Sequence, residues 1–251
     1  MGRHWGQHFF WNKGLAEKIV NLIDIKKGDY VIEIGPGKGI LTEFILAKTD
    51  NLKVIEIDRK LADELRKKFE NLEIIEGDFL KIDLDKILNK KFKLISNLPY
   101  KISSPTLLKI FKYRESFQEG VLVIQKELAE RIVSKENSKK YSPLSILLQI
   151  FFEIKIAFHL SPGSFNPPPQ VDSSAIIIKK RKMPLFKIKE PEKFKEFLDR
   201  IFNQRRKKLK NNLLDCERDA LKNEKIIEMR AEQLSIARLY ELYRRVYEAC
   251  G

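Results

Sequence analysis

Apolar residues in the first part of the chain gather in short runs, separated by segments with helical periodicity. The runs with strand character cover residues 30–34, 52–57, 72–75, 92–95 and 121–124. After the first run, Ile40, Leu41, Phe44 and Ile45 recur at the spacing of a helix face. Near-continuous apolar strands that alternate with helices predict a parallel sheet covered on both faces.

Two later apolar runs, at residues 151–160 and 174–180, flank a proline-rich loop over residues 161–169. This loop is too short for a crossover helix, so the two strands are predicted to be antiparallel. Beyond them, apolar residues recur only at helical spacing. The positions that define two amphipathic helices are Phe194, Phe197, Leu198, Ile201 and Phe202, then Ile236, Leu239, Tyr240, Tyr243, Val246 and Tyr247. The pattern predicts a doubly wound α/β domain and a small all-α domain, over residues 1–182 and 183–251.

Charge and composition narrow the class of partner. Lys and Arg total 49 against 35 Asp and Glu, a formal net charge of +14, which favours polyanionic partners. Two Cys and three His are too few and too scattered for a disulfide framework or a Cys-rich zinc site. The longest apolar stretch, residues 146–158, is interrupted by charges and too short to span a bilayer. We expect a cytoplasmic protein without a metal ion or a membrane partner.

A glycine-rich segment, residues 33–39 (Glu-Ile-Gly-Pro-Gly-Lys-Gly), ends the first strand and opens a helix. Gly35 and Gly37 let the backbone turn sharply and let a ligand approach the main chain. The third glycine falls at position 39, one residue short of the dinucleotide-binding fingerprint. With Glu33 ahead of it, the spacing resembles motif I of class I S-adenosylmethionine-dependent methyltransferases. An ordinary strand-to-helix turn is the alternative.

Two carboxylates follow the next strands at positions suited to a nucleoside. Glu56 lies at the carboxyl end of the second strand, about 20 residues past the glycines, where an acid can accept both ribose hydroxyls. Asp58 is better explained as a helix cap. Asp78 follows the third strand and can accept from an adenine amino group, although a turn-forming Asp fits equally well.

The tetrapeptide Asn97, Leu98, Pro99 and Tyr100 follows the fourth strand. An exocyclic aromatic amine is a poor nucleophile because its lone pair is delocalised into the ring. The Asn97 amide oxygen and the Leu98 carbonyl can accept its two N–H groups and favour tetrahedral nitrogen. Pro99 stiffens the turn, and Tyr100 offers a face to an unstacked base. This chemistry needs orientation and preorganised electrostatics, with no general base, metal or covalent intermediate. A plain Asn/Pro turn is the alternative.

These motifs resemble, in order, those of the KsgA family of ribosomal RNA adenine dimethyltransferases, over almost the whole chain. Residues 6–10 (Gly-Gln-His-Phe-Phe) are similar to its N-terminal motif, and residues 162–173 to its proline-rich loop. In that loop the family's Phe, here Phe165, stacks on the target adenine. Residues 202–209 and 230–234 resemble its helical C-terminal domain. The resemblance implies that S-adenosylmethionine is bound by His8, Phe10, Gly35, Gly37, Glu56, Asp78 and Asn97.

The resemblance further implies a Rossmann-like class I fold, and we expect the enzyme to be a monomer. It implies dimethylation of N6 of two adjacent adenines in 16S RNA, in a small ribosomal subunit or its precursor. Two positions depart from the family pattern, since His8 replaces Asn and Phe10 replaces Leu. His can still form hydrogen bonds and Phe is still apolar, so we expect function to survive.

A run of cations suggests how RNA is held. Residues 205–210 hold five cations, which cannot share one face of a helix. We assign phosphate contacts to Arg205, Arg206, Lys207 and Lys208. A solvated charged face is the alternative. Phe165 and Tyr100 are expected to clamp a flipped base from two sides, unless Phe165 belongs to the core.

Three other functions remain open. An Erm-type enzyme would modify large-subunit RNA, although residues 230–234 and the preceding basic helix, expected over residues 205–210, favour KsgA. A non-catalytic RNA-binding assembly factor could keep this fold, although the intact tetrapeptide and Glu56 argue for chemistry. A DNA adenine methyltransferase more usually carries Asp-Pro-Pro-Tyr than the Asn-Leu-Pro-Tyr found here.

Overall fold

The computed structural model describes residues 8–88, 90–222 and 224–250, with the side chains of residues 249 and 250 left out. Contacts between Cα atoms divide the chain into two compact units. The first comprises Met1–Ala129 and Phe152–Arg181, and the second comprises Glu130–Phe151 and Lys182–Gly251. Among the described residues, no helix is long and apolar enough to cross a lipid bilayer.

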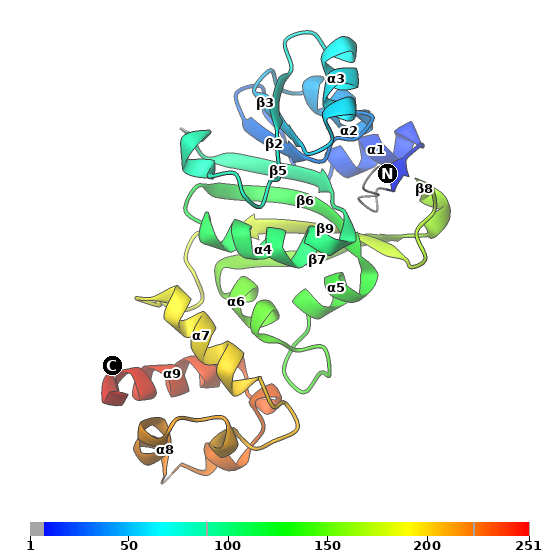
Figure 1. Ribbon diagram of the computed structural model, residues 1–251. Helices are drawn as coiled ribbons and strands as arrows, with labels where there is room; N and C mark the ends of the chain where they lie inside the picture. Colours follow the sequence, from blue (N-terminus) through cyan, green and yellow to red (C-terminus); the bar gives the residue numbers. More distant parts are fainter. Residues whose placement is uncertain (1–7, 89, 223, 251) are drawn as a thin grey trace. The chain divides into compact units, whose positions relative to one another are not determined.

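A seven-stranded sheet forms the centre of the first unit, in the order β4-β3-β2-β5-β6-β9-β7 (Figure 1). The strands are β2 Tyr30–Ile34, β3 Leu52–Glu56, β4 Glu73–Glu76, β5 Phe92–Asn97, β6 Phe117–Gln125, β7 Phe152–Leu160 and β9 Ser173–Lys180. The five strands from β4 to β6 run parallel, and β9 runs antiparallel to both β6 and β7. The predicted α/β fold and the antiparallel final pair are therefore confirmed.

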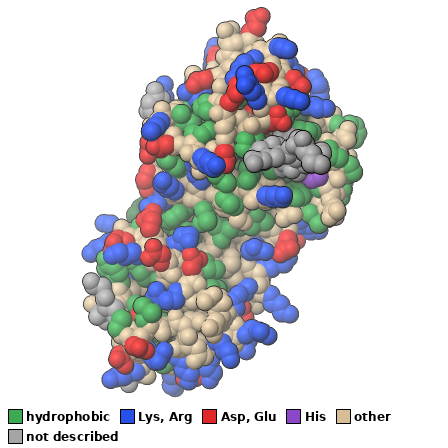
Figure 2. Space-filling model, viewed as in Figure 1, with side chains coloured by type: hydrophobic (Ala, Val, Ile, Leu, Met, Phe, Trp, Pro, Cys, Tyr) green, Lys and Arg blue, Asp and Glu red, His purple; other side chains and the backbone are tan. Residues whose placement is uncertain are grey.

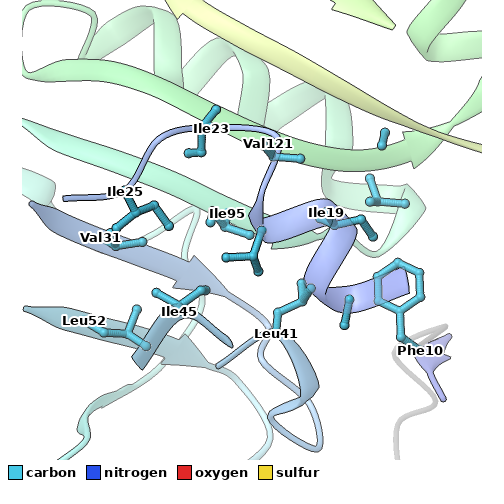
Figure 3. Close-up of a cluster of buried hydrophobic side chains, with 14 of the residues drawn as sticks. Phe10, Ile19, Ile23, Ile25, Val31, Leu41, Ile45, Leu52, Ile95 and Val121 are labelled. Carbon is cyan, nitrogen blue, oxygen red and sulfur yellow. The ribbon is translucent and has the colours of Figure 1, made fainter. Parts of the chain in front are cut away.

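Helices cover this sheet because their apolar faces match its buried strands. The helices of this part of the chain are α1 Lys13–Val20, α2 Ile40–Leu46, α3 Arg59–Lys68, α4 Ser103–Lys112 and α5 Lys126–Ile132. Ile19 of α1 and Ile45 of α2 are fully buried against one sheet face with Val31, Ile95 and Val121 (Figure 3). Helix α3 begins where expected, because the Asp58 side chain accepts from the main-chain N–H groups of the first turn.

A second, two-stranded sheet joins distant parts of the chain. Strand β1 (Phe9–Phe10) pairs antiparallel with β8 (Phe165–Asn166), which lies in the proline-rich loop. The loop also holds a short 3₁₀ helix, η3 (Pro162–Ser164). Neither strand is predicted from the sequence, because two residues are too few to show alternation. The pairing fixes the N-terminal segment to the loop.

The second unit is helical. Its α-helices are α6 Pro143–Phe151, α7 Pro191–Ile201, α8 Asp215–Leu221 and α9 Ile236–Cys250. Phe194 of α7 packs edge-on against Tyr243 of α9, with ring centroids 5.0 Å apart. Its 3₁₀ helices are η4 Leu209–Asn211, η5 Lys225–Glu228 and η6 Ala231–Gln233, while η1 Leu84–Lys86 and η2 Tyr100–Ile102 belong to the first unit.

Residues 130–151 group with the C-terminal residues, although the sequence suggested one boundary after residue 182. Tyr141 is fully buried, and its ring meets Phe202 at a centroid distance of 6.0 Å. The main-chain N–H of Asn137 donates to the Glu232 carbonyl at 2.8 Å. These are contacts between residues far apart in the chain, which local hydrophobic patterns do not record.

Candidate active site

A cavity of about 420 Å³ lies at the carboxyl ends of the parallel strands β2, β3, β4 and β5. Open α/β sheets bind ligands at this edge, and the volume falls in the usual range for small-molecule sites. Its walls come from β1, the glycine loop, the ends of β3 and β4, the tetrapeptide after β5, and β8. All these elements belong to the first unit.

The glycine loop turns from β2 into α2 through left-handed backbone. Gly35 and Gly37 have φ of +61° and +59°. Gly35 lines the cavity, and a Cβ placed on it would meet no atom within 4 Å. A Cβ on Gly37 would lie 2.5 Å from Phe9 Cε1. Gly35 therefore leaves room for a ligand, whereas Gly37 lets the Phe9 ring pack against the loop.

Glu56 ends β3 with its carboxylate held by main-chain donors. Its Oε2 accepts from the Gly37 N–H at 3.2 Å, and its Oε1 accepts from the Asp58 N–H at 2.9 Å. Burial raises the pKa of the Glu56 carboxyl, and these hydrogen bonds act against that rise. The residue is only 1% exposed yet lines the cavity. Glu56 thus presents a fixed acceptor pair at the position expected for ribose hydroxyls.

A second buried carboxyl, Glu33, lies on β2 just before the loop. Thr42 Oγ1 donates to Glu33 Oε2 at 2.6 Å. Burial, together with the nearby negative charge of Glu56, raises the pKa of Glu33 to about 8. The Glu33 side chain is therefore mostly protonated at neutral pH and supports the first turn of α2.

Asp78 lies in the turn after β4, where its Oδ1 accepts from the Leu80 N–H at 2.9 Å. The neighbouring Phe79 is buried and also lines the cavity. The Lys109 ammonium donates to the carbonyls of Phe79 and Ile82 and lies 4.7 Å from the centroid of the Phe79 ring. Burial lowers the pKa of Lys109. This contact from α4, which the sequence does not reveal, anchors the Asp78 turn.

The tetrapeptide begins with the last residue of β5. Asn97 Nδ2 donates to the His8 carbonyl at 2.7 Å, which fixes the amide plane and leaves Oδ1 as its acceptor. Leu98 is 2% exposed and donates its N–H to the Val123 carbonyl at 3.1 Å. Among the described residues, none donates to Asn97 Oδ1 or to the Leu98 carbonyl oxygen. Two acceptors therefore remain for a ligand.

Pro99 and Tyr100 complete the turn into α4. Pro99 precedes the 3₁₀ helix that begins at Tyr100. The Tyr100 hydroxyl is 2.8 Å from Ser173 Oγ, and burial raises the pKa of Tyr100. The Tyr100 ring lies 5.7 Å from that of His8, centroid to centroid. The aromatic wall of the cavity is thus fixed by contacts with β9 and the N-terminal segment.

Phe165 lies in the β8 strand and is 4% exposed. Its ring stacks on Phe10, with centroids 4.9 Å apart and planes at 26°. Phe165 and Tyr100 line the same cavity, but the Phe165 ring is also part of the apolar core. Phe10 is 6% exposed and backs Phe165 without lining the cavity itself.

The cavity therefore brings together most of the site residues expected from the sequence. Those that line it are His8, Gly35, Glu56, Asp78, Asn97, Leu98, Pro99, Tyr100 and Phe165. Phe10 and Gly37 stand behind this wall. Residues 6 and 7 of the N-terminal motif lie outside the described part of the chain. The other lining residues, which the sequence does not single out as cofactor contacts, are Phe9, Ile34, Ile55, Ile57, Gly77, Phe79, Lys101 and Ile102. The sequence shows only that most of these residues lie next to the end of a strand, and many residues that do not line the cavity share this property.

The basic run lies in the second unit, where Lys and Arg side chains are spread over the visible surface (lower part of Figure 2). The prediction of an α-helix over residues 205–210 is wrong. After α7 the chain forms hydrogen-bonded turns, and the 3₁₀ helix η4 follows at Leu209–Asn211. Arg205 pairs with Glu232 at 2.8 Å, and Lys208 pairs with Glu228 at 2.7 Å. Arg206 and Lys207 are exposed and have no ion-pair partner among the described residues.

Comparison with known proteins identifies relatives over nearly the full length. A 213-residue match to ribosomal RNA small subunit methyltransferase A of Malacoplasma penetrans is 44% identical and covers 84% of this chain and 77% of the relative. The protein of the same name from Chlorobium limicola is 39% identical over 96% of this chain and 91% of its own.

A solved structure agrees with the sequence relatives. The crystal structure of a dimethyladenosine transferase from Plasmodium falciparum superposes with a TM-score of 0.82 at 26% identity. The match covers 96% of this chain and 98% of that one. The family model described as ribosomal RNA adenine dimethylase matches residues 2–248. The chain therefore belongs to the ribosomal RNA adenine dimethylase family.

Proposed function

We propose that this protein transfers methyl groups from S-adenosylmethionine to N6 of two adjacent adenines in 16S ribosomal RNA. The observation that carries the proposal is one cavity that holds both Glu56 and the tetrapeptide from Asn97 to Tyr100. The relatives named small subunit methyltransferase A support the choice of the small ribosomal subunit. We place the activity in the cytoplasm, in a monomer that acts on the subunit or its precursor.

The hydrogen-bond acceptors and the apolar walls of the cavity fit S-adenosylmethionine. Glu56 offers a buried carboxylate for two hydroxyls, Asp78 offers one for an amino group, and Gly35 leaves open space at the cavity wall. Apolar walls from Ile57 and Phe79 suit an adenine ring. When bound, S-adenosylmethionine supplies an electrophilic methyl group on a sulfonium centre. His8 and Asn97 also line the cavity, where His8 can form a hydrogen bond to the methionine part of the cofactor.

The remaining chemistry belongs to the turn after β5. Asn97 Oδ1 and the Leu98 carbonyl accept the two N–H groups of the target amine and favour a tetrahedral nitrogen with an available lone pair. The Asn97 bond to the His8 carbonyl keeps this acceptor from rotating, so little reorganisation is needed during transfer. Tyr100 offers its ring to the purine, while Phe165, which belongs to the apolar core, contributes only the part of its surface that lines the cavity. The proton is released from nitrogen to water after transfer, without a dedicated base.

RNA is held outside the cavity by exposed cations. Arg206 and Lys207 are available for phosphate contacts, whereas Arg205 and Lys208 must exchange their carboxylate partners to make them. We therefore assign the larger phosphate contribution to Arg206 and Lys207.

Incubation with labelled S-adenosylmethionine and unmodified small or large ribosomal subunits tests the proposal. We expect label as N6-dimethyladenosine at two neighbouring positions of the small-subunit RNA. Label in large-subunit RNA would favour an Erm-type enzyme. Binding to small subunits without label would indicate an assembly factor that has the site but does not use it.

A further inference from the structure

An exposed tryptophan directly follows β1, whose Phe9 lines the cavity. This residue, Trp11, is 63% exposed, although large aromatic side chains are usually much more buried. Its indole Nε1 donates to the Gly163 carbonyl at 2.9 Å. The ring is therefore held in one orientation while most of its surface stays in water.

The backbone that carries Trp11 is rigid and belongs to the cavity wall. Phe10 pairs with Phe165 across β1 and β8, and the His8 ring nitrogen is 2.8 Å from the Pro167 carbonyl. Together with the Trp11 hydrogen bond, these contacts join four successive residues, 8–11, to the proline-rich loop. Prolines in the loop further reduce its freedom.

Trp11 lies close to residues of the cavity wall on two segments of the chain. Phe9 lines the cavity, whereas Phe10 is buried against Phe165. The Trp11 side chain donates to Gly163, which precedes Phe165, another lining residue, by two positions. Trp11 thus follows a strand that contributes to the cavity wall and is hydrogen-bonded to the loop that carries Phe165.

A substrate with two adjacent adenines needs somewhere to put the second base. While one adenine occupies the cavity, its neighbour is unstacked and exposed. Aromatic faces bind such bases well, and the Trp11 ring is already oriented, so little side-chain entropy is lost on binding. The Lys101 side chain at the cavity wall adds a positive charge suited to the linking phosphate.

We propose that Trp11 is a stacking platform for the unpaired base next to the adenine undergoing methylation. This inference rests on the proposed function and adds a substrate-contacting residue outside the cavity. It makes Trp11 a determinant of RNA binding and of the transition from the first adenine to the second, with no part in binding S-adenosylmethionine.

The test compares Trp11→Ala with Trp11→Phe in the full-length protein. Phe keeps an aromatic face and loses the indole N–H, whereas Ala loses both. For Trp11→Ala we expect KM for unmodified small subunits to rise by roughly 5- to 150-fold, the usual effect of losing one stacked base. Products modified at only one of the two adenines should accumulate. Trp11→Phe should restore most of the loss, and the Kd for S-adenosylmethionine should match wild type in both variants.

Two results would overturn the inference. One is a wild-type KM and product distribution in Trp11→Ala. The other is an equal loss in both variants with weaker S-adenosylmethionine binding, which would show that Trp11 only secures β1 against the loop. If the wild-type protein itself transferred no methyl group to small subunits, the proposed function would fail instead, which is a separate readout.

Discussion

Replacing Gly37 with Ala tests how the glycine loop shapes the cavity. Gly35 and Gly37 have nearly the same left-handed φ, +61° and +59°. An L-residue in that region costs about 1–2 kcal/mol, so either substitution should carry this cost. Only the Gly37 Cβ would also collide with a neighbour, at 2.5 Å from the Phe9 ring. Overpacking of this kind costs about 1–3 kcal/mol.

The expected losses of unfolding free energy therefore differ between the two variants. They are about 1–2 kcal/mol for Gly35→Ala and about 2–5 kcal/mol for Gly37→Ala. Urea unfolding of the ligand-free proteins, followed by circular dichroism, measures both. In the double variant Gly37→Ala/Phe9→Ala the collision disappears. The losses of unfolding free energy in Gly37→Ala and in Phe9→Ala should therefore add up to about 1–3 kcal/mol more than the loss in the double variant.

Ligand affinity gives a second readout for the same variants. The Gly35 Cβ would enter the open space of the cavity directly, and the Gly37 Cβ would displace Phe9, which lines it. Both variants should bind S-adenosylmethionine more weakly, as measured by calorimetry. Equal stabilities of Gly35→Ala and Gly37→Ala, with no coupling to Phe9, would refute this account of the loop.

Glu33→Gln should change how stability depends on pH. The pKa of Glu33 is raised to about 8 in the folded state, so between pH 5 and 8 the folded protein keeps a proton that the unfolded chain releases. The free energy of unfolding of the wild type should therefore fall as pH rises through this range, by up to about 1.4 kcal/mol per pH unit relative to Glu33→Gln. Urea midpoints that change in parallel with pH in the two proteins would contradict this. Glu56→Gln replaces one of the two oxygens that accept main-chain N–H groups with an NH2 group, which only donates. The side chain thereby also loses an acceptor for a ribose hydroxyl, so S-adenosylmethionine affinity should fall in equilibrium dialysis, and unchanged affinity would exclude Glu56 from the site. Replacing Arg206 and Lys207 with Gln should lower the slope of log binding constant against log salt concentration, for small subunits, by about 1 per lost phosphate contact. The control variant Arg206→Lys/Lys207→Arg keeps both charges and should keep the slope. An unchanged slope in the Gln variant would remove these residues from the interface.

The sheet could be predicted because strands buried on both faces read as continuous apolar runs. The apolar run at residues 121–124 predicts the second half of β6. The first half, which begins at Phe117, is not predicted because Glu119 and Gly120 interrupt the apolar pattern. The two-residue strands β1 and β8 leave no periodic signal at all. Residues 130–151 join the second unit through contacts distant in sequence, which no local pattern contains.

Residues at strand ends were the predictable part of the site, since parallel strands bring their carboxyl ends to one edge. Gly35, Glu56, Asp78 and Asn97 all follow from this rule and line one cavity. Lys109 could not be found in this way, because it reaches the site from α4 through main-chain carbonyls.

The geometry of the turn after β5 is the central claim, and Asn97→Ala tests it most directly. The variant removes one of two acceptors for the target amine and also the bond to the His8 carbonyl. Single-turnover methyl transfer to unmodified small subunits should be abolished, while the Kd for S-adenosylmethionine stays within a few-fold of wild type. Wild-type transfer rates in Asn97→Ala would show that this amide does not orient the nucleophile.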